Sequence, residues 1–393
     1  MRRLAGYSEN CVPIEMDYLD LFSQLGTPAW QRVAFSFALC AALMPLALPL
    51  ARRFGLVDHP GGRKDHHCAM PVVGGLVIYL VVVASFWFFE GGFDRRTGTF
   101  MACAGLLMLV GQLDDYFDLR WTWRIGAQAV AALMLVLVAG VMATNLHDVF
   151  GFTGANMGWL AIPFTVFIVV GVINALNMAD GVDGLAGSLS LVALVLYACF
   201  ALYAGNLVVV ERILIVAAAV LGFLVWNARL PWQPRAKVFL GNGGSMLLGF
   251  TIAYFSVRLS QGVDHPVSPV LGPWALALPL IDCVTLMIRR WRQGRSPFAA
   301  DRHHMHHMLL DAGFRASAVV VIIAGSSLML GVAAAVALKL GVYRPLLVLA
   351  FLVLLAGWYA FSCDYDRAVA RLARWRNARI SGPSPDAAES EAH

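Results

Sequence analysis

Charged side chains are scarce in this sequence. Only 13% of its 393 residues are Asp, Glu, Lys or Arg, whereas a soluble globular domain carries roughly a quarter. Hydrophobic residues make up 60% and are spread over the whole length, with a mean hydropathy of +0.71. One buried core with a solvated surface cannot use so many apolar residues. The composition excludes an ordinary soluble domain and predicts a polytopic integral membrane protein.

Paired cysteine motifs are also absent. The seven cysteines stand singly, with neither a Cys-x-x-Cys pair nor a disulfide framework, so we interpret them as packing thiols. The net charge of +5 is modest. In a chain this apolar it indicates loop topology and anionic lipid or phosphate partners, and no nucleic acid.

Long apolar runs predict transmembrane helices, because lipid offers no partner for free backbone groups. We predict an all-α fold with about eleven such helices. They form one polytopic transmembrane domain over residues 30–363, after an N-terminal lead at 1–29 and before a basic cytoplasmic tail at 364–393. The predicted spans are 30–50, 72–89, 98–113, 125–143, 158–177, 184–204, 212–229, 240–257, 270–288, 317–338 and 344–363.

The distribution of Lys and Arg predicts the orientation. Loops after the odd-numbered spans, together with the C-terminal tail, hold 20 of the 29 basic residues. Because basic loops stay in the cytoplasm, the N-terminus is predicted to be periplasmic and the C-terminus cytoplasmic.

Unusual polar sequence occurs in five places, and every one falls on the predicted cytoplasmic face. The outer loops hold nothing comparable. Five such clusters on one face predict a single site. They are 58–67 (DHPGGRKDHH), 114–118 (DDYFD), 174–183 (NALNMADGVD), 237–245 (KVFLGNGGS) and 301–307 (DRHHMHH).

Carboxylates dominate two of the clusters. Asp114 and Asp115 stand where the third span meets the cytoplasm, and interfacial acids are costly and typical of functional sites. A solvated helix end with nearby arginines is the alternative for this pair. Asp180 and Asp183 lie beside Asn174, Asn177 and Gly181. Capping of the next helix would explain one of these acids, but not all four polar groups.

The last two clusters supply hydrogen-bond donors. Glycines at 241–245 suit a phosphate at a helix start, although the run lacks a P-loop ending and a flexible turn is the alternative. Arg302 and four histidines fill 301–307. Zinc would need Cys or acidic partners that are missing at a typical spacing. We therefore interpret this cluster as a grip on a phosphorylated substrate, with a loop facing lipid headgroups as the alternative.

Carboxylates able to hold Mg²⁺, basic donors and glycine turns on one face together indicate phosphoryl transfer between a soluble nucleotide and a lipid phosphate. A transporter, the rival from another class, should carry its sites near the bilayer midplane on broken helices. The predicted spans are largely free of charge, so the enzyme is favoured.

The five clusters, in this order, resemble the polyprenyl-phosphate N-acetylhexosamine-1-phosphate transferase family over about residues 50–315. The pattern D-x-P-x-x-R-K-x-H appears from Asp58 to His66, the aspartate pair as Asp114–Asp115, and N-x-x-D-G-x-D-G from Asn177 to Gly184. The H-x-H-H motif is His304 to His307. AMPVVGG and DRHHMHH are similar to the branch that transfers N-acetylglucosamine-1-phosphate (GlcNAc-1-phosphate) for O-antigen and related glycans.

The resemblance implies a cytoplasmic-facing active site in the bacterial inner membrane. It also implies UDP-GlcNAc and undecaprenyl phosphate as substrates, UMP as a product and Mg²⁺ as cofactor, with Mn²⁺ as the alternative metal. Another UDP-N-acetylhexosamine as donor and a homodimer both stay open. The expected residues are Asp114, Asp115, His304, His306 and His307 for catalysis; Lys64, Asn174, Asn177, Asp180, Gly181, Asp183, Phe239 and Arg302 for substrate binding; and Asp115, Asp180, Asp183 and Asn242 for the metal.

One position departs from the family pattern. The family usually has F-[ML]-G-D-x-G-S, with the aspartate tied to Mg²⁺, whereas this chain has Asn242 there. An amide oxygen can still ligate Mg²⁺, but the site loses one negative charge. A natural variant with a rearranged metal site, a catalytically impaired paralogue and an engineered substitution are the three explanations.

Overall fold

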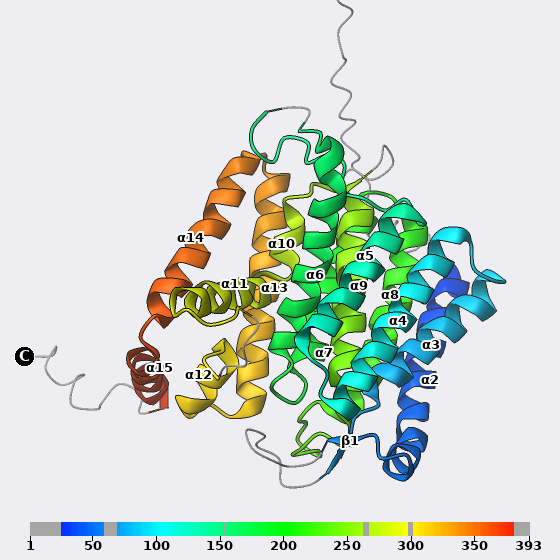
Figure 1. The fold of residues 1–393 in the computed structure, drawn as a ribbon, viewed down its shortest axis with the longest axis horizontal. Coiled ribbons are helices and arrows are strands. Elements are labelled where there is room, and N and C mark those ends of the chain that lie inside the picture. The colour runs from blue at the N-terminus through cyan, green and yellow to red at the C-terminus, as the bar shows by residue number, and fades with distance from the viewer. Residues whose placement is uncertain (1–24, 59–68, 153–154, 262–266, 298–301, 381–393) are drawn as a thin grey trace, which may run out of the picture.

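The computed structural model of the protein describes residues 25–58, 69–152, 155–261, 267–297 and 302–380. Helices make up most of this part of the chain, and the only strands described form a two-residue antiparallel pair, β1 with β2 (Figure 1). The elements are α2 (Gly26–Arg53), β1 (Val57–Asp58), β2 (Met70–Pro71), α3 (Gly74–Glu90), α4 (Arg95–Phe117), α5 (Trp121–Leu137), η1 (Gly158–Leu160), α6 (Ala161–Ala179), α7 (Leu185–Tyr203), α8 (Leu207–Asn227), α9 (Gly241–Ser260), α10 (Leu271–Ala275), α11 (Ala277–Arg292), α12 (Met305–Asp311), α13 (Ala316–Lys339), α14 (Arg344–Ser362) and α15 (Tyr365–Ile380).

Seven helical segments in this part of the chain are long and apolar enough to cross a membrane. They are α2, α4, η1 with α6, α7, α8, α13 and α14. The outer helices expose large apolar side chains, such as Leu349, Leu352 and Val353 of α14, which suits contact with lipid tails and not with water. The fold is therefore that of an all-α integral membrane protein.

The ninth predicted span is broken in the structure. Residues 271–275 form α10 and residues 277–292 form α11, which runs across its neighbours in Figure 1. Leu276 between them has φ −130° and ψ 38°. Pro279 explains the break, because proline has no N–H to bond the carbonyl of Ala275 and its ring clashes with that carbonyl.

Two further segments differ from the sequence-based expectation. The fourth helix ends at Leu137 and not at residue 143, and Gly140 in the irregular segment that follows has φ +67°. The segment from residue 364, expected only as a basic tail, contains the helix α15. Its high charge hid it from a search for apolar runs.

Helix α9 is the central helix of this bundle and packs against α3, α4, α6 and α7. Glycines make the contacts close. A Cβ atom at Gly111 of α4 would lie 2.3 Å from the Cα atom of Gly243, and one at Gly75 of α3 would lie 2.2 Å from the Cα atom of Gly244. Only glycine permits such an approach of two backbones. The start of α9 is therefore fixed against both helices.

Main-chain hydrogen bonds fix the segment before α9. The N–H groups of Gly74 and Gly75 donate to the carbonyls of Phe239 and Leu240, each over 3.0 Å, and the Phe239 N–H donates to the Pro71 carbonyl over 2.8 Å. These bonds satisfy N–H groups at the start of α3 that have no partner within the helix. They also align residues 239–242 beside the end of α4.

The glycine contact predicts a large effect for a single methyl group. Gly111→Ala would force α4 and α9 apart, and overpacking of this kind costs about 1–3 kcal/mol, so the thermal unfolding midpoint in detergent micelles should fall. Gly126→Ala is the matched control, because a Cβ atom at Gly126 in α5 meets nothing within 4 Å. Equal midpoints for the two variants would show that the backbones do not touch.

Candidate active site

All five polar segments contribute residues to one cavity of about 630 Å³. Six aspartates line it, which is an unusual concentration of negative charge for one cavity. The lining consists of Asp58, Val72, Asp114, Asp115, Asp118, Asp180, Gly181, Val182, Asp183, Asn227, Phe239, Leu240, Gly241, Asn242 and His307. Lys64, expected to bind substrate, lies outside the described residues.

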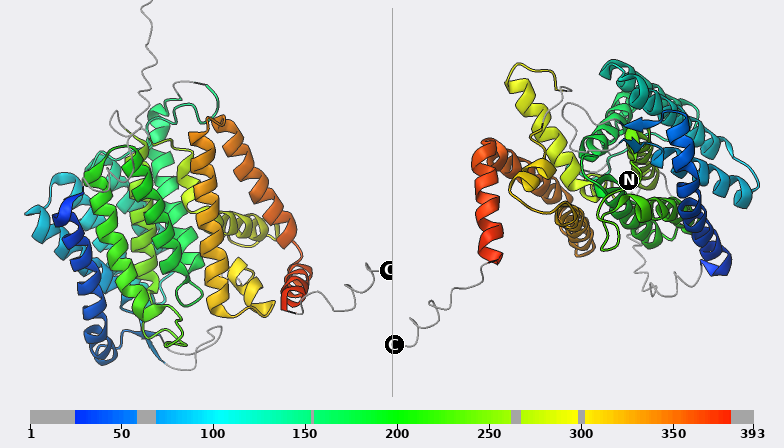
Figure 2. Two further views of the ribbon diagram at one scale, coloured as in Figure 1. Left: turned by 180° about the vertical axis from the view of Figure 1, so that it is seen from behind. Right: turned by 90° about the horizontal axis from the view of Figure 1, so that it is seen from below.

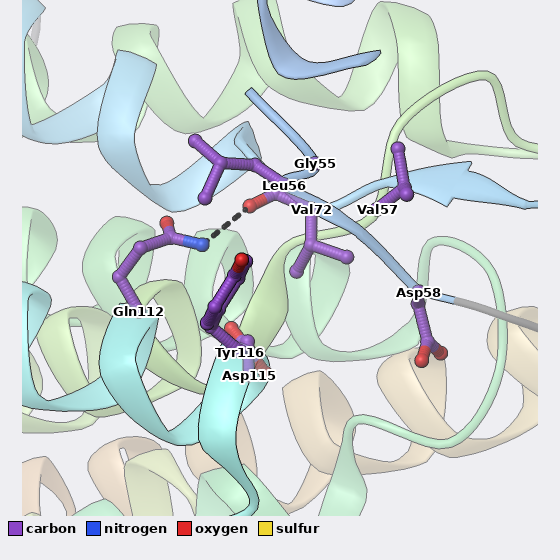
Figure 3. Close-up of a pocket in the computed structure, with 8 residues that line it drawn as sticks. All are labelled: Gly55, Leu56, Val57, Asp58, Val72, Gln112, Asp115 and Tyr116. Carbon is purple, nitrogen blue, oxygen red and sulfur yellow. Dashed lines mark hydrogen bonds between the residues drawn. The ribbon is translucent and has the colours of Figure 1, made fainter. Parts of the chain in front are cut away.

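A second cavity of about 550 Å³ adjoins the first and shares Asp58, Val72 and Asp115 with it. Figure 3 shows Tyr116 and Gln112 on the α4 side, with the Gln112 amide donating to the Val72 carbonyl over 3.2 Å. That bond ties α4 to the segment before α3. Asp115 therefore stands between the two cavities.

Asp115 faces the start of α9. Its carboxylate accepts the Asn242 N–H over 2.9 Å and 3.2 Å at its two oxygens. Gly241, with φ +80°, lies against it, since a Cβ atom there would lie 2.7 Å from Asp115 Oδ2. The carboxylate thus caps a helix from a distant segment and benefits from the partial positive charge of the helix start.

Arginines neutralise two of the other acids. Asp114 is buried and pairs with Arg124 over 3.1 Å. Asp183 pairs with Arg229 over 2.8 Å and accepts the Ala236 N–H over 3.3 Å. Within the described ranges no ion pair joins Asp115 or Asp180 to Lys or Arg.

Asp180 follows the last residue of α6 and its side chain is reached from the cavity. The surrounding protein and the charges of Asp115 and Asp183 raise the pKa of Asp180 to about 7. A carboxyl with that pKa is half protonated at neutral pH. A bound cation would favour its ionised form and displace the proton.

Asn177 and Asn242 are in direct contact. The Asn177 amide donates to Asn242 Oδ1 over 2.9 Å and to Ser245 Oγ over 2.8 Å. Neither Asn177 nor Asn174, both expected to bind substrate, is among the lining residues, but Asn177 contacts the lining residue Asn242. The Asn174 amide donates instead to Gln128 Oε1 over 2.7 Å and to the Val170 carbonyl over 2.8 Å. Asn174 lies a helical turn before Asn177, and this turn carries it into the contact between α5 and α6.

The histidines form a layered group in which only His307 lines the cavity. The ring of His306 is buried, with its centroid 4.3 Å from that of His307, and it rests on Gly181, where a Cβ atom would lie 2.2 Å from His306 Nε2. Burial and the neighbouring imidazoles lower the pKa of His306 well below its ordinary value, so His306 stays neutral. Arg302 is exposed and is not among the lining residues.

Asp282 supports the histidine group, and sequence reasoning missed it. This buried carboxylate of α11 accepts from His304 Nδ1 over 3.1 Å and from the Met305 N–H over 3.0 Å. It therefore fixes the His304 ring and caps the start of α12. A lone acid inside the predicted span 270–288 was the available signal, because acids within apolar spans are rare and functional.

Asn227 is a second residue that sequence reasoning missed. It ends α8, lines the cavity, accepts the Gly184 N–H over 2.8 Å and donates to the Val238 carbonyl over 2.8 Å. These two bonds join the start of α7 to the segment before α9.

The chemistry of the lining suits a hard divalent cation. Within the described part of the chain, no three His, Cys, Asp or Glu side chains are grouped closely enough to hold a metal by themselves. Mg²⁺ needs only one or two protein carboxylates together with phosphate oxygens of a substrate. Asp115 and Asp180 supply such oxygens at one cavity, so the residues present fit the ion.

Comparisons with known proteins identify the family of this chain. The pattern of the family named "Glycosyl transferase family 4" matches residues 98–260. An undecaprenyl-phosphate alpha-N-acetylglucosaminyl 1-phosphate transferase of Escherichia coli strain K12 is 33% identical over 277 residues, which are 70% of this chain and 75% of the relative. The protein of that name from Yersinia pestis is 32% identical over 91% of this chain and 97% of the relative.

The chain belongs to glycosyl transferase family 4. The family resemblance predicted from the five motifs is thereby confirmed. In this family member, the matched residues 98–260 include Asp114, Asp115, Asp180, Asp183 and Asn242, all of which line the cavity.

Removal of the Asp282 carboxylate should loosen the histidine group. Asp282→Ala leaves the His304 ring and the Met305 N–H without an acceptor in a buried place, at a cost of about 2–5 kcal/mol, so the thermal unfolding midpoint should drop. Asp282→Asn keeps one acceptor oxygen, so its unfolding midpoint should fall less. Asp366→Ala on the exposed side of α15 is the control. A midpoint unchanged in Asp282→Ala would contradict the support role.

Proposed function

We propose that this protein transfers GlcNAc-1-phosphate from UDP-GlcNAc to undecaprenyl phosphate. The products would be undecaprenyl-diphospho-GlcNAc and UMP, at the start of O-antigen or related cell-envelope glycan synthesis. The names of the relatives describe this acceptor and this sugar. The observation that carries the proposal is the acid-rich cavity in which Asp115 and Asp180 have no arginine partner in the described ranges.

The reaction exchanges one phosphoanhydride bond for another. An oxygen of the lipid phosphate attacks the phosphorus that carries GlcNAc, and the bond from that phosphorus to the oxygen shared with the uridine-bearing phosphate breaks. The electron pair leaves with UMP. Positioning and charge neutralisation supply most of the catalysis in such a transfer.

Asp115 and Asp180 would hold the Mg²⁺ ion, with Mn²⁺ as the alternative. Bound there, the ion neutralises charge on the phosphates. Asp114 and Asp183, each paired with an arginine, would position Arg124 and Arg229 beside the cavity. His307 would donate to the diphosphate, while His304 and His306 hold it in place from behind. Phe239, Gly181, Asn177, Lys64 and Arg302 complete the proposed substrate contacts.

The membrane arrangement is part of the same proposal. Ten of the eleven predicted spans match described helices, and the ninth is divided between α10 and α11. We propose that the eleven spans cross the bacterial inner membrane with the N-terminus periplasmic. The excess of basic residues on one side supports a cytoplasmic cavity, where a soluble nucleotide sugar is available. Residues 30–363 would form the catalytic domain.

The assay is release of UMP from UDP-GlcNAc by purified protein with undecaprenyl phosphate and Mg²⁺. Asp115→Asn and Asp180→Asn should each lower turnover by about 10²–10³-fold, the usual cost of losing a group that helps to stabilise charge in the transition state. Asp148→Asn, at the opposite end of the helices, is the control. Turnover close to that of the unchanged chain in both cavity variants would refute the proposed site.

Asn242→Asp tests the residue that departs from the family pattern. The new carboxylate can still accept from Asn177 and adds a negative charge near Asp115, and a charge-assisted contact is worth about 1–3 kcal/mol. The Mg²⁺ concentration for half-maximal turnover should then fall by roughly ten-fold or more.

Two other outcomes are informative for Asn242. An inactive chain that gains activity on Asn242→Asp would identify a catalytically impaired paralogue or an engineered substitution. If Asn242→Asp does not change the Mg²⁺ dependence of turnover, residue 242 does not hold the metal. UDP-sugars with other N-acetylhexosamines, tested in the same assay, report the donor specificity.

A further inference from the structure

Helix α15 lies across the direction of the spans. It looks short in Figure 1 and extends lengthwise in the right-hand view of Figure 2, which is taken from below, so its axis runs in another direction than those of α13 and α14. Only Cys363 and Asp364 separate it from α14. It lies at the edge of the molecule, close to α12.

The position of α14 places α15 at the level of lipid headgroups. α14 is the least buried of the candidate spans, and its exposed leucines and valines suit lipid tails. The end of its apolar run at Ser362 therefore marks the edge of the hydrocarbon layer. A helix that turns sideways directly after that edge runs along the headgroup layer.

One face of α15 is basic. Arg367, Arg371 and Arg374 are exposed and follow the i, i+4, i+7 spacing that puts side chains on one side of a helix. Arg367 is paired with Asp364, but both side chains are strongly exposed, so this pair is weak and can exchange with other anions.

The other face of α15 contacts the histidine-bearing segment. Ala368 is fully buried. The Tyr365 hydroxyl donates to Asp311 Oδ2 over 2.6 Å, and its ring centroid lies 4.6 Å from that of His303. The Trp375 ring lies 6.0 Å from that of Phe314. Tyr365 therefore contacts the residues at both ends of α12, which carries His307, and Trp375 contacts the segment that follows α12.

We propose that the arginine face of α15 binds anionic phospholipid headgroups and thereby holds α12 and its histidines at the cavity. Each basic side chain near an anionic surface gains about 1 kcal/mol, roughly a five-fold change in the equilibrium. Three arginines on one face suffice to make the docking of α15 depend on the anionic lipid content of the membrane. The effect on turnover rests on the proposed function, whereas the docking does not.

The full chain in lipid nanodiscs tests the docking. Hydrogen–deuterium exchange of residues 365–378 should slow by about ten-fold or more when about 30% phosphatidylglycerol replaces phosphatidylcholine. The triple variant Arg367→Gln, Arg371→Gln, Arg374→Gln should lose this dependence. The matched triple variant to Lys keeps the charge and should retain it. Raising the salt concentration should weaken it in the unchanged chain.

Several results would overturn the proposal. Equal exchange in neutral and anionic discs shows that no headgroup docking occurs and that another partner, such as a second copy of the chain, covers the face. Slowed exchange that persists in the Gln variant places the lipid contact elsewhere. If α15 docks but phosphatidylglycerol does not change UMP release, docking does not affect the histidines at the cavity. An absence of UMP under every condition refutes the proposed function alone, and the exchange result still stands.

Discussion

Backbone contact through glycine places the start of α9 against α3 and α4, and the cavity depends on that placement. Asp115 can reach the Asn242 N–H only because Gly111, one turn earlier in α4, touches Gly243. Asn177 can reach Asn242 and Ser245 only because the same turn of α9 faces α6. Moving α9 away from its neighbours by the width of one methyl group would lengthen these contacts beyond hydrogen-bond distance. The donors and acceptors of the cavity are therefore set by packing within the membrane.

Charge in the cavity is divided between two kinds of acid. Arg124 and Arg229 neutralise Asp114 and Asp183, which limits the repulsion that six aspartates around one cavity would otherwise produce. Within the described residues Asp115 accepts only from backbone N–H groups, and Asp180 lines the same cavity. Asp118 also lines the cavity and has no ion pair with Lys or Arg in the described ranges, so negative potential stays concentrated at the cavity. Such a place attracts a divalent cation and resists an additional anion until the cation is present.

Much of this arrangement could be predicted from the sequence, because apolar run length and polar interruptions are local properties. Ten of the eleven predicted spans match helices with small differences at their ends. Which polar side chains contact one another could not be predicted, because that depends on their neighbours in three dimensions. Examples are the ion pair of Asp114 with Arg124, the contact of Asn177 with Asn242, and the support of His304 by Asp282. Asn174 shows the same limit, because a single helical turn directs it away from the cavity. Pro279 indicates the break after α10, but the apolar run around it favoured the prediction of one continuous span.

The order in which the chain is synthesised gives the ion pairs another consequence. Asp114 meets its arginine only ten residues later, so its charge is paired almost as soon as both enter the membrane. His307, in contrast, follows Asp115 by about 190 residues, which at about 5–20 residues per second is on the order of ten seconds or more of translation. Until His307 is made, Asp115 and the later Asp180 line a cavity that lacks this histidine. A nascent chain arrested before α12 should therefore present these acids without the histidine group.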